Sequence, residues 1–133
     1  MVSFVRRALW AILLSFFMVA TTDALTQEQI VSLVREHHDV ILREVTEGED
    51  FTQTLAIGGV QSAHPFDGGC AFYCGGSGMG PDAYYTGFFY ASRQPDVSSA
   101  QPHENGWLFQ GEGDNRQYME KLCDHFYYYW QQY

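Results

Sequence analysis

The amino-acid sequence predicts an α+β fold: an N-terminal amphipathic helix, a small antiparallel sheet of about three to five strands, and a C-terminal aromatic helix packed on one face of the sheet. Three observations support this prediction. Apolar residues recur at helical spacing after residue 25, short aromatic or alternating runs separated by glycine and proline fill the middle of the chain, and a second helix-capping signal precedes an aromatic run near residue 126.

The start of the chain has the features of a secretory signal peptide. Arg6 and Arg7 give the N-terminal region a positive charge, and an apolar run of thirteen residues follows at Ala8–Ala20. A membrane-spanning helix needs roughly 20 such residues, so this run is too short to cross a bilayer. We therefore expect residues 1–24 to be removed and residues 25–133 to form one secreted, extracellular domain with no membrane span.

Composition excludes several classes of protein. The chain carries a formal net charge of −9, and no cluster of basic residues offsets it. Such a charge repels phosphate backbones, so nucleic acid is not an expected partner. Aromatic residues make up 17% of the chain, which is far more than disordered segments contain. We expect a folded domain with a small core.

The N-terminal helix is predicted over Leu25–Glu47. Thr26 is placed to cap it, and Gln29 three residues later completes a capping box. Gly48 is suited to end the helix because glycine readily adopts the left-handed conformation found there. The apolar face has helical spacing and consists of Ile30, Leu33, Val34, His37, Ile41 and Val45.

Strands are predicted in the middle of the chain from alternation and from aromatic or β-branched content. A glycine-rich loop at 64–81 contains two of the three cysteines, and the polar segment Arg93–Gly106 is predicted to be a surface loop. The interior Gly87 indicates a bulge or a close neighbour. The expected strands are Phe51–Ile57, Cys70–Cys74 within the glycine-rich loop, Tyr84–Ser92 and Trp107–Gln110.

A second helix is predicted after Asp114, which would cap it with Gln117 completing the box. Its apolar stripe consists of Tyr118, Leu122, Phe126 and Tyr129. The run 126–130 is apolar on every side, which indicates either packing on several sides or an exposed contact patch.

Three cysteines allow one intrachain disulfide and leave one thiol over. Because Cys70 and Cys74 are close in sequence, we expect a bridge from Cys123 to one of them. The remaining thiol would be free, reactive, or bonded to another chain. The zinc-site alternative of Cys70, Cys74, Cys123 and His125 explains the same residues less simply in an oxidising compartment, so neither a metal nor a cofactor is predicted.

The predicted function is that of a non-enzymatic extracellular interaction module. Its expected partner is another extracellular protein or a second copy of the chain in a disulfide-linked dimer. Tyrosine and other aromatic side chains provide large contact area at low entropic cost. The predicted contact residues are Phe72, Tyr73, Tyr84, Tyr85 and Tyr128.

Two alternatives remain open. A secreted thiol-dependent hydrolase or amidase would use Cys70 or Cys74 as nucleophile and His64 or His103 as base. Cys70-Ala71-Phe72-Tyr73 resembles the Cys-x-x-Tyr segment of bacterial peptidoglycan amidases, although Glu104-Asn105-Gly106 replaces the apolar strand expected after the histidine. The other alternative is a disulfide-linked structural protein of an extracellular coat, with which the glycine and tyrosine content agrees.

Overall fold

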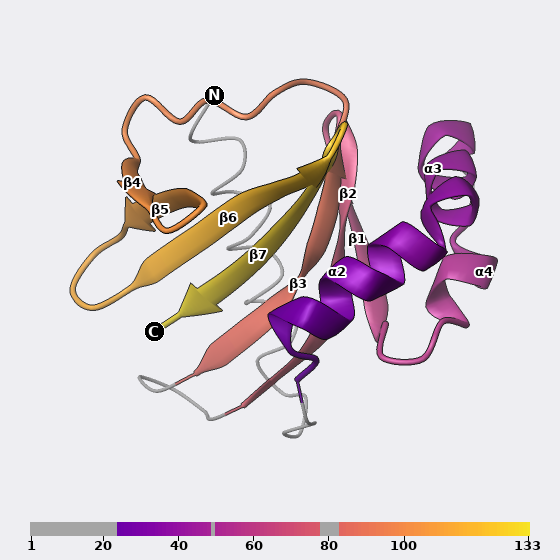
Figure 1. Cartoon of the computed structure of the whole chain (residues 1–133), viewed down its shortest axis with the longest axis horizontal. Helices are drawn as coiled ribbons and strands as arrows, with labels where there is room; N and C mark the ends of the chain where they lie inside the picture. The colour runs from indigo at the N-terminus through magenta and orange to yellow at the C-terminus, as the bar shows by residue number, and fades with distance from the viewer. Residues whose placement is uncertain (1–23, 49, 78–82) are drawn as a thin grey trace.

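The computed structural model describes residues 24–48, 50–77 and 83–133, so the predicted signal peptide lies outside the described residues except for Ala24. Three described helices precede a seven-stranded antiparallel sheet of order β1-β2-β3-β7-β6-β5-β4 (Figure 1). The helices are α2 (Gln27–Glu36), α3 (His38–Glu47) and α4 (Thr52–Leu55). The strands are β1 (Ser62–Phe66), β2 (Gly69–Ser77), β3 (Tyr84–Ala91), β4 (Gln101–His103), β5 (Gly106–Gln110), β6 (Arg116–Cys123) and β7 (Phe126–Gln132).

The predicted C-terminal helix is wrong, as is the prediction of a small sheet. Residues 116–132 form the β6–β7 hairpin, whose turn contains His125 with a left-handed φ of 70°. The aromatic run 126–130 has the high strand propensity of tyrosine, phenylalanine and tryptophan. It is apolar on every side because β7 lies between β3 and β6 and both of its faces are covered.

The predicted strand Phe51–Ile57 is also wrong, because its centre forms the single helical turn α4. The Glu44 carboxylate holds this turn: Oε1 accepts from Thr54 N at 2.7 Å and from Thr54 Oγ1 at 2.6 Å, and Oε2 accepts from Gln53 N at 3.0 Å. Burial by itself would raise the pKa of Glu44, but these hydrogen bonds lower it below its ordinary value. The charged carboxylate thus fixes α4 against α3.

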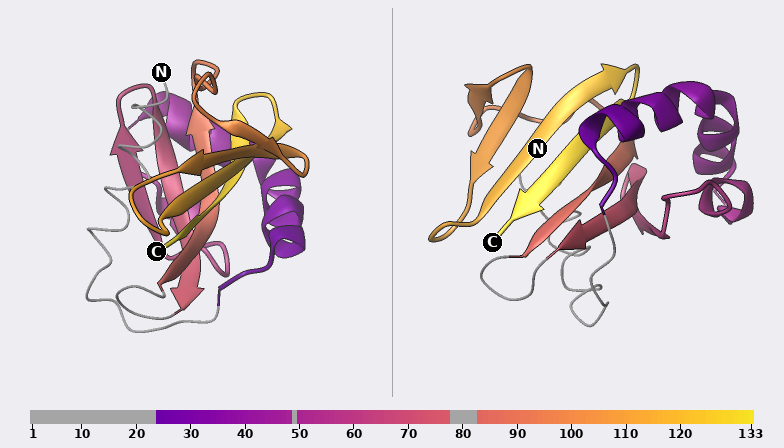
Figure 2. Two further views of the ribbon diagram at one scale, coloured as in Figure 1. Left: turned by 90° about the vertical axis from the view of Figure 1, so that its left-hand side faces the viewer. Right: turned by 60° about the horizontal axis from the view of Figure 1, so that its bottom comes forward.

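The N-terminal helical segment is divided at His37, whose φ of −108° and ψ of 18° leave the helical region. Thr26 forms the expected capping box, with Gln29 N donating to Thr26 Oγ1 at 3.1 Å and Thr26 N donating to Gln29 Oε1 at 2.8 Å. Gly48 ends α3 in the left-handed conformation at φ 76°. The break lets α2 and α3 present their apolar residues to the sheet from two directions (Figure 2).

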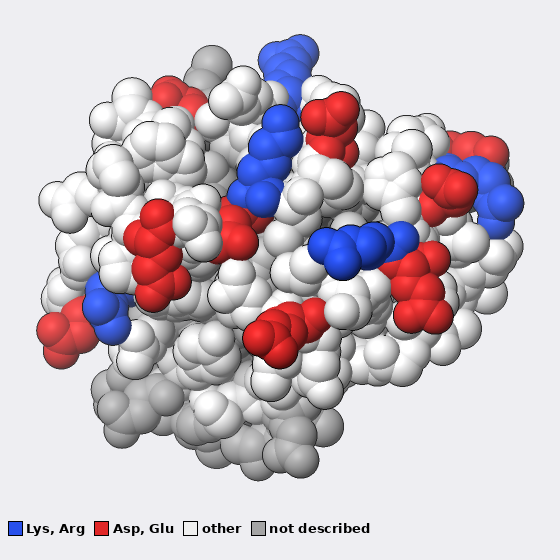
Figure 3. All heavy atoms as spheres, in the orientation of Figure 1, with Lys and Arg blue, Asp and Glu red and all other residues white. Residues whose placement is uncertain are grey.

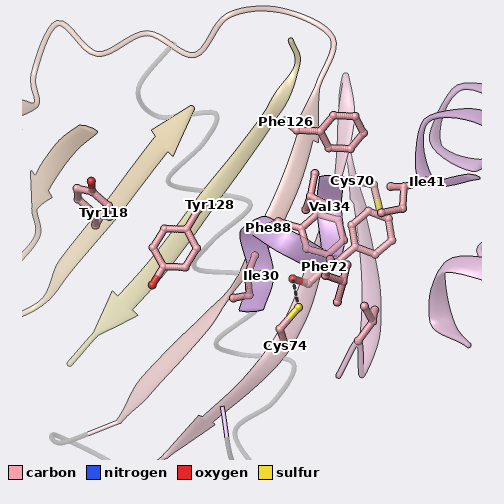
Figure 4. Close-up of a cluster of buried hydrophobic side chains, with 12 residues drawn as sticks. Ile30, Val34, Ile41, Cys70, Phe72, Cys74, Phe88, Tyr118, Phe126 and Tyr128 are labelled. Atoms are coloured by element: carbon pink, nitrogen blue, oxygen red, sulfur yellow. Dashed lines mark hydrogen bonds between the residues drawn. The ribbon is translucent and has the colours of Figure 1, made fainter. Parts of the chain in front are cut away.

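The two faces of the sheet have different coverings. On the first, here called the helix side, Ile30, Val34 and Ile41 pack against side chains of β2, β3 and β7 (Figure 4). The opposite, helix-free face has its own cluster of buried side chains, to which none of the described helices contributes. The residues of that cluster are Ala71, Tyr73, Ala83, Tyr85, Phe89, Ala91, Phe109, Met119, Tyr127 and Tyr129.

Both edge strands contain a proline. Pro65 lies in β1 and Pro102 in the three-residue β4, and each lacks the backbone N–H that a further strand would need. Edge strands in natural proteins are commonly protected in this way. Sheet extension by another chain is therefore disfavoured at both edges.

Candidate functional site

The five predicted contact residues divide between the two faces of the sheet. Phe72, Tyr84 and Tyr128 point to the helix side, whereas Tyr73 and Tyr85 lie on the helix-free face with their ring centroids 5.8 Å apart. Four of the five are buried, and only Tyr84 is half-buried. Alternate residues of a strand point to opposite faces, so tyrosines that are neighbours in sequence cannot form one surface.

Tyr84 belongs to a row of rings that we call the aromatic strip, formed by Tyr84, Trp130 and Tyr118 on the neighbouring strands β3, β7 and β6. The Tyr84 and Trp130 centroids are 6.3 Å apart. Tyr118 stacks on Trp130 with centroids 5.6 Å apart and an interplanar angle of 20°. Tyr118 is buried, while Trp130 and Tyr84 are half-buried and reach solvent.

Polar groups hold the strip in place. The guanidinium carbon of Arg116 lies 5.8 Å from the centroid of the Trp130 ring, and Arg116 Nη2 donates to Gln132 Oε1 at 2.6 Å. Tyr118 Oη donates to Glu120 Oε1 at 2.6 Å. Gln27 Nε2 of α2 donates to the other oxygen of the Glu120 carboxylate at 3.1 Å. The Trp130 and Tyr118 rings are thus each held by a polar neighbour.

Tyr118 of the strip and the neighbouring buried Tyr128 both keep their protons well above neutral pH. Burial raises the pKa of Tyr118, and the hydrogen bond to Glu120 together with its negative charge raises it further. Burial likewise raises the pKa of Tyr128 above its ordinary value. The strip therefore presents aromatic rings, and the guanidinium group of Arg116 lies over one of them, Trp130.

Figure 3 shows this side of the molecule. Uncharged atoms predominate, and acidic and basic side chains are scattered over the surface without forming one extended basic patch. The formal net charge of the whole chain is −9, and on this face side chains of both signs are visible.

The structure does not bring together the residues of the thiol hydrolase alternative. Cys70 and Cys74 are buried on the helix side, 1% and 0% exposed, whereas His64 pairs with Ala71 and shares the opposite face. His103 lies in β4, five strand positions from β2 in the sheet order. The centroid of its ring lies 5.8 Å from the centroid of the Tyr118 ring.

The two buried thiols are also poorly suited to nucleophilic chemistry. Burial raises the pKa of Cys70 to about 12 and that of Cys74 to about 12. A thiolate is the reactive form, so thiols with such pKa values are protonated and unreactive at neutral pH. Burial also lowers the pKa of His64. This arrangement gives no support to catalysis by either cysteine.

All three cysteines are free thiols in the structure, and no pair of them is bonded. Cys123 is half-buried at the end of β6, beside a cavity of about 350 Å³ that is also lined by Val34, His38 and Leu122. Among the described residues, no group of three or more histidine, cysteine, aspartate or glutamate side chains could hold a metal ion.

The difference in burial predicts selective labelling of the cysteines. We expect iodoacetamide at about pH 8 to modify Cys123 at least about tenfold faster than Cys70 or Cys74, because only Cys123 reaches solvent without opening of the sheet. Peptide mass spectrometry after timed quenching measures the three rates. The denatured chain is the control and should label all three alike. Equal rates in the folded protein would contradict the enclosed positions of Cys70 and Cys74.

Sequence reasoning missed Trp130 and Arg116 as site residues. A signal was present in the sequence. In a hairpin that turns near His125, alternate residues on each strand share a face, and this places Arg116 opposite Gln132 and Tyr118 opposite Trp130. The prediction of a helix after Asp114 concealed this alternation.

Comparisons with protein-family models, with curated proteins and with solved structures find no significant match to this chain. Within the residues that the structure describes, no helix has the length and apolar character required to cross a membrane.

Proposed function

We propose that the chain is a small secreted, acidic, non-enzymatic interaction module that binds another extracellular protein through the aromatic strip. The observation that carries the proposal is the position of Trp130, whose ring stacks on Tyr118, lies beside Arg116 and still reaches solvent. Tryptophan, tyrosine and arginine are the residues that most often dominate the binding energy of protein interfaces.

Rigidity of the strip also supports binding. Trp130 and Tyr84 are supported by neighbouring strands, and the Glu120 carboxylate ties Tyr118 to α2 through Gln27. Rings that are already held in place lose little conformational freedom when a partner covers them, so more of the contact energy appears as affinity.

Charge indicates the chemistry of the partner. The chain has a formal net charge of −9, and around the uncharged strip both signs of charge are scattered. A partner with an apolar centre and a predominantly basic rim would be attracted by the acidic excess, whereas an acidic partner would be repelled. We therefore propose a basic extracellular protein as the occupant of the strip.

Site-specific photo-crosslinking tests this proposal. A benzophenone amino acid replaces Tyr84 in the secreted protein, which is then illuminated in its native extracellular fluid. We expect a discrete adduct with a basic protein, which an excess of unlabelled wild-type protein abolishes. Trp130→Ala protein should compete at least about thirtyfold less well, because truncation of a central aromatic contact costs about 2 kcal/mol or more.

The matched control places the same amino acid at Tyr90, which is half-buried on the same face of the same strand but outside the strip. It should give no such adduct. Arg116→Gln protein should compete less well than wild type and show weaker salt dependence. Equal crosslinking from both positions, or equal competition by folded Trp130→Ala protein, would refute the strip as the binding surface.

A further inference from the structure

Two buried glutamines on the helix-free face have no hydrogen-bond partners. Gln117 of β6 is 3% exposed and Gln131 of β7 is 1% exposed, and they stand directly opposite each other in the β6–β7 register. The Nε2 and Oε1 atoms of both side chains lack a partner among the described residues. Buried side-chain polar atoms are paired in most proteins, so four unpaired atoms at one place require an explanation.

The two amides have more hydrogen-bonding capacity than they could satisfy between themselves. Each carries two N–H donors and one carbonyl oxygen that accepts twice. A rotation that joined Gln117 to Gln131 by one hydrogen bond would still leave donors and an acceptor free on both. A group that donates to one amide and accepts from the other would satisfy the pair better.

The surroundings of the pair are apolar and largely aromatic. Phe109 of β5 pairs with Gln117, and Tyr85 of β3 pairs with Gln131. Met119 and Tyr129 lie two residues further along the same strands and face. All four of these side chains are buried, with exposures of 8% or less. Rings that surround a small polar centre are typical of sites for small organic ligands.

Charge is absent from this cluster. Among the buried residues that the structure describes, the only charged one is Glu44 of α3, which is not part of this face. The partly buried apolar side chains packed against the cluster are Phe66, Val97, Ala100, Trp107 and Tyr133. An ion placed there would lose its hydration without gaining a counter-charge. The ligand chemistry that fits is therefore neutral.

We propose that Gln117 and Gln131 form the polar centre of a second binding site, on the face opposite the aromatic strip, for a small neutral aromatic molecule that carries one amide or hydroxyl group. The ring of the ligand packs among Phe109, Tyr85 and Tyr129. Its polar group accepts from one glutamine N–H and donates to the other glutamine carbonyl. This site is independent of the protein partner proposed for the strip.

Benzamide is the probe that tests the site, with benzoate as the charged analogue and toluene as the apolar analogue. In NMR titrations of the secreted protein, benzamide should shift the side-chain NH₂ resonances of Gln117 and Gln131, which are assigned from the Gln117→Leu and Gln131→Leu variants. We expect saturable binding at least about tenfold tighter than that of benzoate or toluene, because two amide contacts are gained.

The double variant Gln117→Leu/Gln131→Leu separates recognition from folding. It should retain or increase the melting temperature, since four unpaired buried atoms are removed. It should bind benzamide at least about tenfold more weakly than wild type while binding toluene no more weakly. The matched control Gln101→Leu changes an exposed glutamine of β4 and should leave benzamide binding unchanged.

Two results would overturn the proposal: no saturable shift of the two NH₂ resonances with benzamide, or undiminished benzamide affinity in the folded double variant. Neither result bears on the photo-crosslinking experiment, whose residues lie on the other face of the sheet.

Discussion

Gly87→Ala is expected to destabilise the fold by about 2–3 kcal/mol. A Cβ at this position would overlap the Phe72 carbonyl oxygen and lie 2.8 Å from the Tyr129 hydroxyl. Neither neighbour can move freely, because Phe72 belongs to the adjacent strand and Tyr129 is completely buried. Thermal unfolding followed by circular dichroism should show a melting temperature lower by about 10 °C.

Gly58→Ala is the matched control for this substitution. The added Cβ would meet nothing within 4 Å, and Gly58 is exposed before β1. Its melting temperature should stay within about 2 °C of wild type. If Gly87→Ala were as stable as Gly58→Ala, the close approach of β2, β3 and the Tyr129 ring would be incorrect.

Phe72→Ala is expected to lower the free energy of unfolding by about 3–5 kcal/mol, which is the largest effect of any substitution considered. The Phe72 ring is 0% exposed, stacks on Phe88 with centroids 4.8 Å apart and meets the edge of Phe51 at 5.6 Å. It therefore joins β2, β3 and the segment that enters α4. Urea denaturation should show a strongly reduced midpoint with little change in the slope.

This result separates two roles for the same residue. The sequence predicts Phe72 as a contact residue, and a contact residue at a surface would lose binding without losing stability. Phe66→Ala is a suitable comparison, because Phe66 is half-buried in the edge strand β1 and touches Phe89 with centroids 6.4 Å apart. Phe66→Ala should lower the free energy of unfolding clearly less than Phe72→Ala does. Equal and small losses of unfolding free energy in both variants would show that Phe72 is not part of the core.

The N-terminal helical segment could be predicted because its signals are local. Thr26, Gln29 and Gly48 specify where helix begins and ends, and the apolar spacing between them has only one regular interpretation. The C-terminal hairpin could not be separated from a helix in the same way. Asp114 resembles a helix cap, and an uninterrupted aromatic run matches a buried strand as well as a helix.

The site was only partly predictable for a related reason. Tyrosines of β2, β3 and β7 could be recognised as unusual, but which of them share a face depends on strand register, which long-range pairing determines. Tyr84 and Tyr128 were identified, whereas Trp130 was not. Gln117 and Gln131 are polar residues at corresponding positions on the two sides of the turn at His125, a symmetry that becomes visible once the hairpin is known.

The position of β7 has a consequence for the order of folding. It follows every other strand in the sequence, yet it lies between β3 and β6 and joins β1–β3 to β4–β6. Until residues 126–132 have been synthesised and released, the two groups of strands have no common neighbour, and the hydrophobic surfaces on both faces stay incomplete. Completion of the sheet is therefore delayed until β7 is available, and the earlier strands must be kept from aggregating in the meantime.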